Sequence, residues 1–173
     1  VAVAFRAKLW NIGAEAQLYA GAILTVVLGT GALPLPAIIL LPLIAIFAAL
    51  AGAMLLLGPA VLKVRFGVDE VVTTLLLNFV MILFVSMLLE GVLKDPTGLG
   101  WPQSQKLIAE ARLPRIVTGR RLHYGFVLAL VSALAVWVVM KKTTLGYEMR
   151  AVGHNPEAAR FSGMPVNRIL LKT

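Results

Sequence analysis

Six polar residues of this chain lie beside or within long hydrophobic runs, where a hydrogen-bonding side chain has few partners. Three cluster around the start of one run and three fall at helical spacing on one side of another: Asn11, Glu15 and Gln17, then Thr73, Thr74 and Asn78. Polar groups inside a membrane are costly, so they normally face the interior of a helix bundle or a pore. These six side chains are therefore candidates for facing such an interior.

The six candidates differ in how readily a purely structural role explains them. Thr73 and Thr74 can each satisfy their hydroxyl by bonding a carbonyl of their own helix. Asn78 is the better candidate, since its amide has four bonding positions to fill. Glu90 and His123 lie near the ends of hydrophobic runs, where water is within reach, so a proton relay at His123 is not favoured.

A second candidate is the polar segment 143–165, which follows a long uncharged run and carries charges of both signs. Asn155, Pro156 and Glu157 predict a helix start: Asn caps free N–H groups, Pro fits the first helical position and Glu complements the helix dipole. Gly163 predicts the helix stop. So short a helix is marginal alone and needs a surface to pack against.

A second short helix is predicted upstream of this one. Leu145, Met149 and Val152 fall on one face of it, and Gly153 is expected to end it, so the two helices would join at Gly153 and His154. Two interpretations of the pair remain open. It is either an ordinary membrane-protein loop with good caps, or a rigid element that docks a soluble partner and transmits force.

Several kinds of chemistry have no residues to support them in this sequence. There is no G-x-x-x-x-G-K-[ST] motif for nucleotide phosphates, no cysteine, no metal-ligand cluster and no nucleophile–base pair. No cofactor or metal is therefore expected. Charged residues make up 14% of the chain and hydrophobic residues 60%, whereas soluble domains carry about 25% charged residues. This composition indicates a bilayer.

Four hydrophobic runs are candidates for membrane helices, each of which needs roughly 20 apolar residues. They cover about residues 16–33, 36–62, 71–90 and 122–140. Gly29 and Gly31 indicate that the first run is irregular or broken, and Pro59 is expected to kink or end the second, before a polar hinge at 63–70. The expected fold is an all-α polytopic transmembrane helix bundle, a fragment with about four membrane-spanning or membrane-embedded helices.

The basic residues lie between the hydrophobic runs, so the net charge of +8 indicates lipid headgroups rather than nucleic acid. If all four runs cross, the N-terminal segment, the 63–70 hinge and the tail after Met140 share one side and hold ten lysines and arginines. The loop 94–121 holds the other six. This excess predicts that segment 143–165 is cytoplasmic and that the loop 94–121 lies outside, and it falls to eight against six if the first run only dips into the bilayer.

The string EAARFSG, residues 157–163, has the form E-A-A-x-x-x-G and resembles the cytoplasmic loop by which ABC-importer permeases dock into their ATPase subunit. The longer string TTLGYEMRAVGHNPEAARFSGM resembles the branched-chain amino acid and monosaccharide permease family. WNIGAEAQLYAGA (10–22) and GVDEVVTTLLLNFV (67–80) are most similar to the nucleoside and simple-sugar permeases that work with basic membrane lipoproteins. One departure is Ala16, where the family usually has glycine. Alanine is small, so packing is expected to survive.

The resemblance implies that residues 1–173 are part of one transmembrane permease domain of the bacterial cytoplasmic membrane, with 143–165 as its coupling-helix loop. The residues that would couple to the ATPase are Gly146, Arg150, Asn155, Pro156, Glu157, Ala158, Ala159, Phe161 and Gly163. Phe161 would be the apolar knob of the docking face, unless it packs back onto its own bundle. The six polar candidates would line the translocation path.

The resemblance also implies the partners. They are an ABC ATPase subunit that hydrolyses the ATP, a homologous second permease subunit, an extracytoplasmic solute-binding lipoprotein and the lipid bilayer. The expected function is the membrane-spanning permease subunit of an ATP-driven importer of a nucleoside or simple sugar, which is not itself an enzyme. An ion-driven secondary transporter is the alternative, although such proteins are expected to carry an acidic or histidine relay deep in the membrane. A membrane enzyme or assembly factor is a third possibility.

Overall fold

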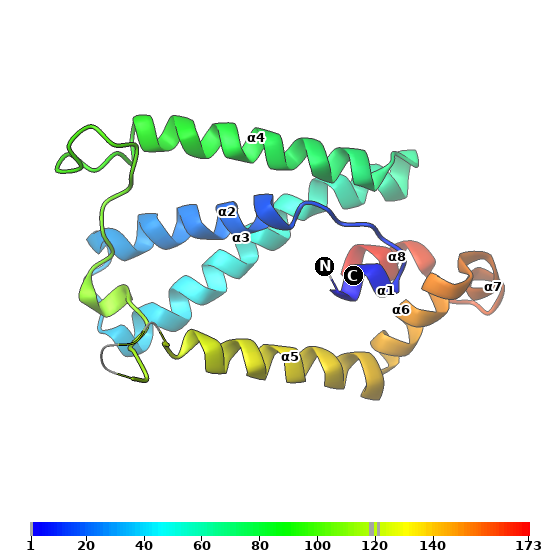
Figure 1. Cartoon of the computed structure of the whole chain (residues 1–173). Coiled ribbons are helices and arrows are strands. Elements are labelled where there is room, and N and C mark those ends of the chain that lie inside the picture. Colours follow the sequence, from blue (N-terminus) through cyan, green and yellow to red (C-terminus); the bar gives the residue numbers. More distant parts are fainter. Residues whose placement is uncertain (1, 118–119, 121) are drawn as a thin grey trace. The chain divides into compact units, whose positions relative to one another are not determined.

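The computed structural model describes residues 2–117, 120 and 122–173, and nearly all of its regular structure is helical (Figure 1). The helices and turns, in chain order, are α1 (Ala2–Arg6), α2 (Ala14–Val27), the π-helical turn η1 (Leu28–Ala32), α3 (Ala37–Phe66), α4 (Glu70–Glu90), the 3-10 turn η2 (Ala109–Ala111), α5 (Gly125–Lys142), α6 (Thr144–His154), α7 (Pro156–Phe161) and α8 (Val166–Lys172). The predicted all-α class is confirmed.

The chain divides into two compact units, each assembled from segments that are distant in sequence. The first unit consists of Val1–Ile12, Leu57–Thr74 and Arg115–Thr173, and the second consists of Gly13–Leu56 and Leu75–Pro114. Helices α3 and α4 contribute residues to both units. The polar segment predicted at 143–165 lies wholly within the first unit.

Within the described residues, three helices are long and apolar enough to cross a membrane: α3, α4 and α5. The most apolar window of each has a mean hydropathy of 2.7, 2.4 and 1.8, and only 17%, 17% and 0% of those windows is buried within the chain. Helices whose apolar surface is left uncovered by their own chain are typical of proteins surrounded by lipid. The predicted spans 71–90 and 122–140 correspond to α4 and α5.

The first hydrophobic run does not form an unbroken span. Helix α2 has 14 residues, about 21 Å at 1.5 Å per residue, which is short of the roughly 30 Å hydrocarbon core. The turn η1 extends it until Gly31, whose φ of +104° is in the left-handed region. The expectation that glycines would break this run is confirmed, and the count of span-length helices among the described residues is three.

The second run is longer than predicted. Helix α3 continues through Pro59 to Phe66 and has 30 residues, so of the two effects expected of Pro59, a kink or an end, the helix end is not found. Proline removes one backbone donor, but the flanking hydrogen bonds of a long apolar helix keep it in register. The predicted hinge at 63–70 therefore shrinks to the non-helical residues 67–69.

Each unit has its own small apolar core. In the second unit, buried Leu40, Ile44 and Ala111 pack with half-buried side chains from η1, from the turn before α3 and from the loop before η2. The backbone N–H of Ile108 donates to the carbonyl of Gly29 at 2.9 Å. The loop that follows α4 is thus held against the π-helical turn, where an irregular helix end leaves carbonyl groups to be satisfied.

Candidate functional site

The predicted helix pair in segment 143–165 is present as α6 and α7. The Asn155 side chain accepts hydrogen bonds from the backbone N–H groups of Glu157 and Ala158, at 3.0 and 3.1 Å, and Pro156 occupies the first helical position. These bonds satisfy two of the donors that a helix start leaves unpaired. The sequence-predicted N-terminus of α7 is therefore confirmed in its detail.

The end of α7 is equally well defined. Gly163 has a φ of +81°, and its N–H donates to the carbonyl of Arg160 at 2.9 Å. The next N–H, that of Met164, donates to the carbonyl of Ala159 at 3.0 Å. This pair of bonds is the Schellman arrangement, in which a left-handed glycine closes the last turn. Helix α7 is thus a fixed six-residue element.

Helices α6, α7 and α8 enclose a shared apolar cluster, which we name the elbow core. Its buried members come from all three helices: Met149, Val152, Ala159, Val166 and Ile169. Four partly buried side chains pack against it, from α1, from α5, from the turn after α7 and from α8: Val3, Met140, Met164 and Leu170. Met149 and Val152 were predicted to share this face. Leu145 was predicted there too and is instead exposed, because Gly146 takes the buried position.

Gly146 and Arg150 attach α6 to the end of α5. A Cβ on Gly146 would collide with the carbonyl oxygens of Val139 and Met140, so only glycine allows this approach. The Arg150 guanidinium donates to the carbonyl of Met140. A cation at the C-terminal end of a helix also complements its dipole. Both residues therefore fix α6 on α5.

The outward side of α7 is formed by exposed residues. Phe161 is 95% exposed, so it does not pack onto the described part of this chain. Glu157, Ala158 and Arg160 are also exposed, whereas Ala159 is buried. Helix α7 therefore presents one exposed aromatic side chain among exposed charged ones.

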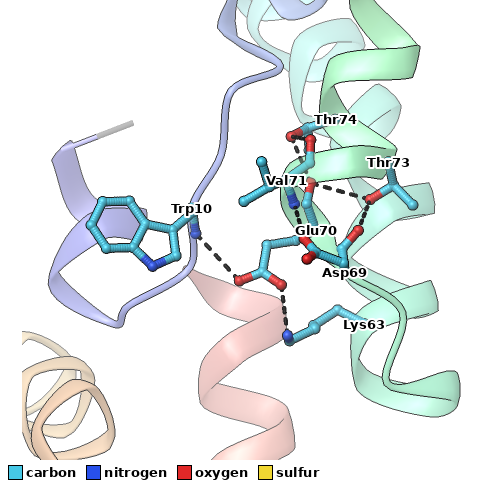
Figure 2. A network of polar contacts seen from close by, with 7 residues as sticks. All are labelled: Trp10, Lys63, Asp69, Glu70, Val71, Thr73 and Thr74. Carbon is cyan, nitrogen blue, oxygen red and sulfur yellow. Dashed lines mark hydrogen bonds and ion pairs between the residues drawn. The ribbon is translucent and has the colours of Figure 1, made fainter.

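Of the two threonines in α4, Thr74 also binds a segment that is distant in sequence. Thr73 is half-buried and donates to the carbonyls of Asp69 and Glu70, at 3.0 and 3.2 Å (Figure 2). Thr74 is buried, donates to the carbonyl of Glu70 at 2.6 Å, and accepts the backbone N–H of Ile12 at 3.2 Å. Both hydroxyls thus bond a backbone carbonyl at the start of their own helix, as the structural explanation of these residues proposed.

Asn78 caps a helix that is distant in sequence. Its side-chain oxygen accepts the backbone N–H of Ala16 at 2.9 Å, and this N–H belongs to the first turn of α2, whose donors have no partner within the helix. Gly13, at the cap position, has no side chain to offer. Ala16, where the resemblance leads one to expect glycine, is fully buried, so its methyl group fits in the interior.

The remaining polar candidates are placed differently from one another. Asn11 is buried and Glu15 is exposed. Gln17 is half-buried, and its amide donates to the carbonyl of Gly52 on α3 at 3.3 Å. It also borders an open, mostly apolar groove of about 520 Å³ between α2 and α3, lined by Gln17, Leu18, Gly21, Ala22, Thr25, Val26 and Ala48.

One polar cluster was not singled out from the sequence. Lys63, near the end of α3, forms an ion pair with Glu70, the first residue of α4, with 2.6 Å between Nζ and Oε2 (Figure 2). The other Glu70 oxygen accepts the backbone N–H of Trp10 at 3.5 Å, a long bond. Asp69 caps α4 by accepting the N–H of Val71 at 2.8 Å. The sequence feature that could have indicated this ion pair is the placement of two opposite charges on either side of the short turn between two apolar runs.

The described residues contain no group of three or more His, Cys, Asp or Glu side chains placed to hold a metal ion. The candidate residues instead form two kinds of structure. One is a capped, exposed helix on a polar elbow, and the other is a set of buried amides and hydroxyls that bind backbone groups near the start of α2. Together with the three span-length helices, they define a multi-pass membrane protein with an exposed helical elbow.

The chain belongs to the family described as branched-chain amino acid transport system / permease component, which it matches over residues 1–173. This confirms the family inferred from the elbow string and the predicted multi-pass location in the cytoplasmic membrane. No solved structure matches the chain.

Three relatives match almost all of the chain. It is 38% identical over 172 residues to a guanosine ABC transporter permease protein of Bacillus subtilis, covering 99% of this chain and 49% of the relative. It is 39% identical over 176 residues to a glucose ABC transporter permease protein of Haloferax volcanii, covering 96% and 46%. A nucleoside ABC transporter permease protein of Lactococcus lactis is 30% identical over 180 residues, covering 98% and 49%. The chain thus spans about half the length of these relatives.

Proposed function

We propose that this chain is part of the membrane-spanning permease subunit of an ATP-driven ABC importer that carries a nucleoside or a simple sugar. ATP is hydrolysed on a separate ATPase subunit. A homologous second permease subunit completes the path, and an extracytoplasmic solute-binding lipoprotein delivers the cargo. Segment 143–165 is the cytoplasmic coupling loop, and residues 1–173 belong to one permease domain.

The observation that carries this proposal is the construction of α7. Six residues with a single buried side chain are too few to form a stable helix alone, yet both ends are fully capped and Phe161 is 95% exposed. A helix whose two ends are capped but whose surface is left exposed by its own chain is suited to bind in a groove on another subunit. The chain belongs to a family of transport-system permeases, so the partner that we propose for α7 is an ATPase.

The alternative, a secondary transporter, has less support. Relatives that match nearly the whole chain carry the name ABC transporter permease. In addition, no Asp, Glu, Lys, Arg or His lies between the two ends of α4 or in the interior of α5, where an ion relay would need a titratable group.

Uptake into proteoliposomes distinguishes these functions. The full-length permease is reconstituted with its second permease subunit, its ATPase and its binding protein, and uptake of labelled guanosine and glucose is measured with ATP, with vanadate, and with an ion gradient alone. ATP-dependent uptake that vanadate abolishes supports the importer. Uptake driven by the ion gradient without ATP would refute it, and the preferred label identifies the cargo class.

A charge reversal tests the role of α7 in the same preparation. Glu157→Lys places a positive charge at the start of α7, which destabilises its first turn by about 0.3–1 kcal/mol, and it also alters the docking face. Co-purification of the ATPase and uptake are both expected to fall. Glu110→Lys, at an exposed glutamate in η2, is the matched control. Equal behaviour of the two variants would show that α7 is an ordinary loop helix.

A further inference from the structure

The N-terminal helix α1 lies against α6 with no side chain between the two backbones. A Cβ added to Gly153 would collide with the carbonyl oxygen of Arg6, and it would lie 3.0 Å from the carbonyl carbon of Arg6 and 3.1 Å from the Cα of Ala7. All three obstructing atoms belong to the backbone of the α1 end. They cannot move aside as the tip of a flexible side chain could.

Small and apolar residues of α1 and the turn after it are also buried in this contact. Ala4 and Ala7 are 5% and 4% exposed, and Val3 packs against the elbow core. The elbow core also contains Val152 of α6 and Ala159 of α7, and both helices lie with α1 in the first compact unit. One continuous apolar contact therefore runs from α7 through α6 to α1.

We propose that α1, α6 and α7 move as one rigid body during transport, and that Gly153 is the positioning residue that joins α1 to the elbow. This inference rests on the proposed function, in which α7 is displaced by the ATPase. Displacement of α7 is then passed to the segment that follows α1, which contains Trp10 and Ile12. That segment is bound in turn to the start of α4 through Glu70 and Thr74.

We expect α1 and α6 to move together because two backbones in direct contact pass a displacement from one to the other. A side chain at the joint would absorb part of the movement by changing its rotamer, whereas a glycine Cα against a carbonyl leaves no such freedom. The predicted role of Gly153 as a helix stop is corrected by this contact. Helix α6 continues through His154, and it ends at Asn155, which is extended because Pro156 follows it.

A distance measurement tests the rigid-body proposal without disturbing the joint. Spin labels are placed on the full-length permease at Ala2→Cys in α1 and Ser162→Cys at the end of α7, in a background without other cysteines; both positions are exposed. Distances are compared between the nucleotide-free complex and the vanadate-trapped complex. Superimposable distance distributions are expected. A shifted distribution in the trapped complex would show that α1 and α7 move separately and would overturn the proposal.

Substitution of the joint gives an independent test. Gly153→Ala is compared with Gly58→Ala, since Gly58 is also helical but has nothing within 4 Å of an added Cβ. The face of α7 is unchanged, so the ATPase should still co-purify with Gly153→Ala. Uptake per ATP hydrolysed should fall below that of the wild type, because an added Cβ forces the two backbones apart. Gly58→Ala should transport like the wild type.

The outcomes separate this inference from the proposed function. If the wild type shows no ATP-driven uptake, the proposed function itself fails. If the wild type transports and Gly153→Ala transports as well as Gly58→Ala, only the inference about α1 fails. If Gly153→Ala does not fold, as judged by size-exclusion chromatography, the proposal is tested by the spin-label distances alone, because that experiment keeps Gly153.

Discussion

Removal of the Asn155 side chain should make α7 open more often. In Asn155→Ala the N–H groups of Glu157 and Ala158 lose their acceptor, and the lost cap costs about 1 kcal/mol. The six residues of α7 bury only one side chain, that of Ala159, so little packing compensates. A loss of that size raises the population of the opened helix about fivefold.

Hydrogen–deuterium exchange on the detergent-solubilised full-length protein measures this effect. The amides of Ala159 and Ser162, which bond within the α7 turn, should exchange about fivefold faster in Asn155→Ala. Asn155→Asp keeps an acceptor oxygen and should exchange like the wild type. Asn167→Ala, at an exposed asparagine in α8, controls for composition. If the alanine and aspartate variants of residue 155 exchange alike, the cap does not hold α7 and the reasoning is wrong.

Three further outcomes follow from other contacts. Asn78→Leu removes the acceptor for the Ala16 N–H and should cost about 1–3 kcal/mol, seen as a lower Tm in detergent; an unchanged Tm would contradict the capping role. Gly163→Val forces a β-branched residue into a φ of +81° and should cost about 1–2 kcal/mol, whereas Gly163→Asn, which tolerates that region, should retain ATPase co-purification. The N–H and hydroxyl of Thr97 lower the pKa of Asp95 below its ordinary value of 3.8, so their stabilisation is complete above that value and is lost as the pH falls through the lowered pKa. Wild-type Tm should therefore decline more steeply below about pH 4 than that of Asp95→Asn, and parallel curves would rule out this contribution.

The sequence by itself determined the features that depend on neighbouring residues. The caps of α7 could be predicted because Asn155, Pro156 and Gly163 act on backbone groups within a few positions of themselves. The span 71–90 coincides with α4 to within one residue at its start, because an uninterrupted apolar run in lipid must satisfy its backbone as a helix. The family followed from the same local strings.

Tertiary structure decided the roles of residues whose partners are distant in the chain. Asn78 was identified as a polar candidate, but only the fold brings it to an N–H that lies 62 positions away. Leu145 and Gly146 have adjacent places on α6, and the close approach of α5 buries the glycine rather than the leucine. Gly153 was predicted to stop a helix and instead contacts α1. A periodic pattern specifies which side of a helix is apolar, whereas the backbone distance to a neighbouring helix is set by packing, and that distance decides where only glycine fits.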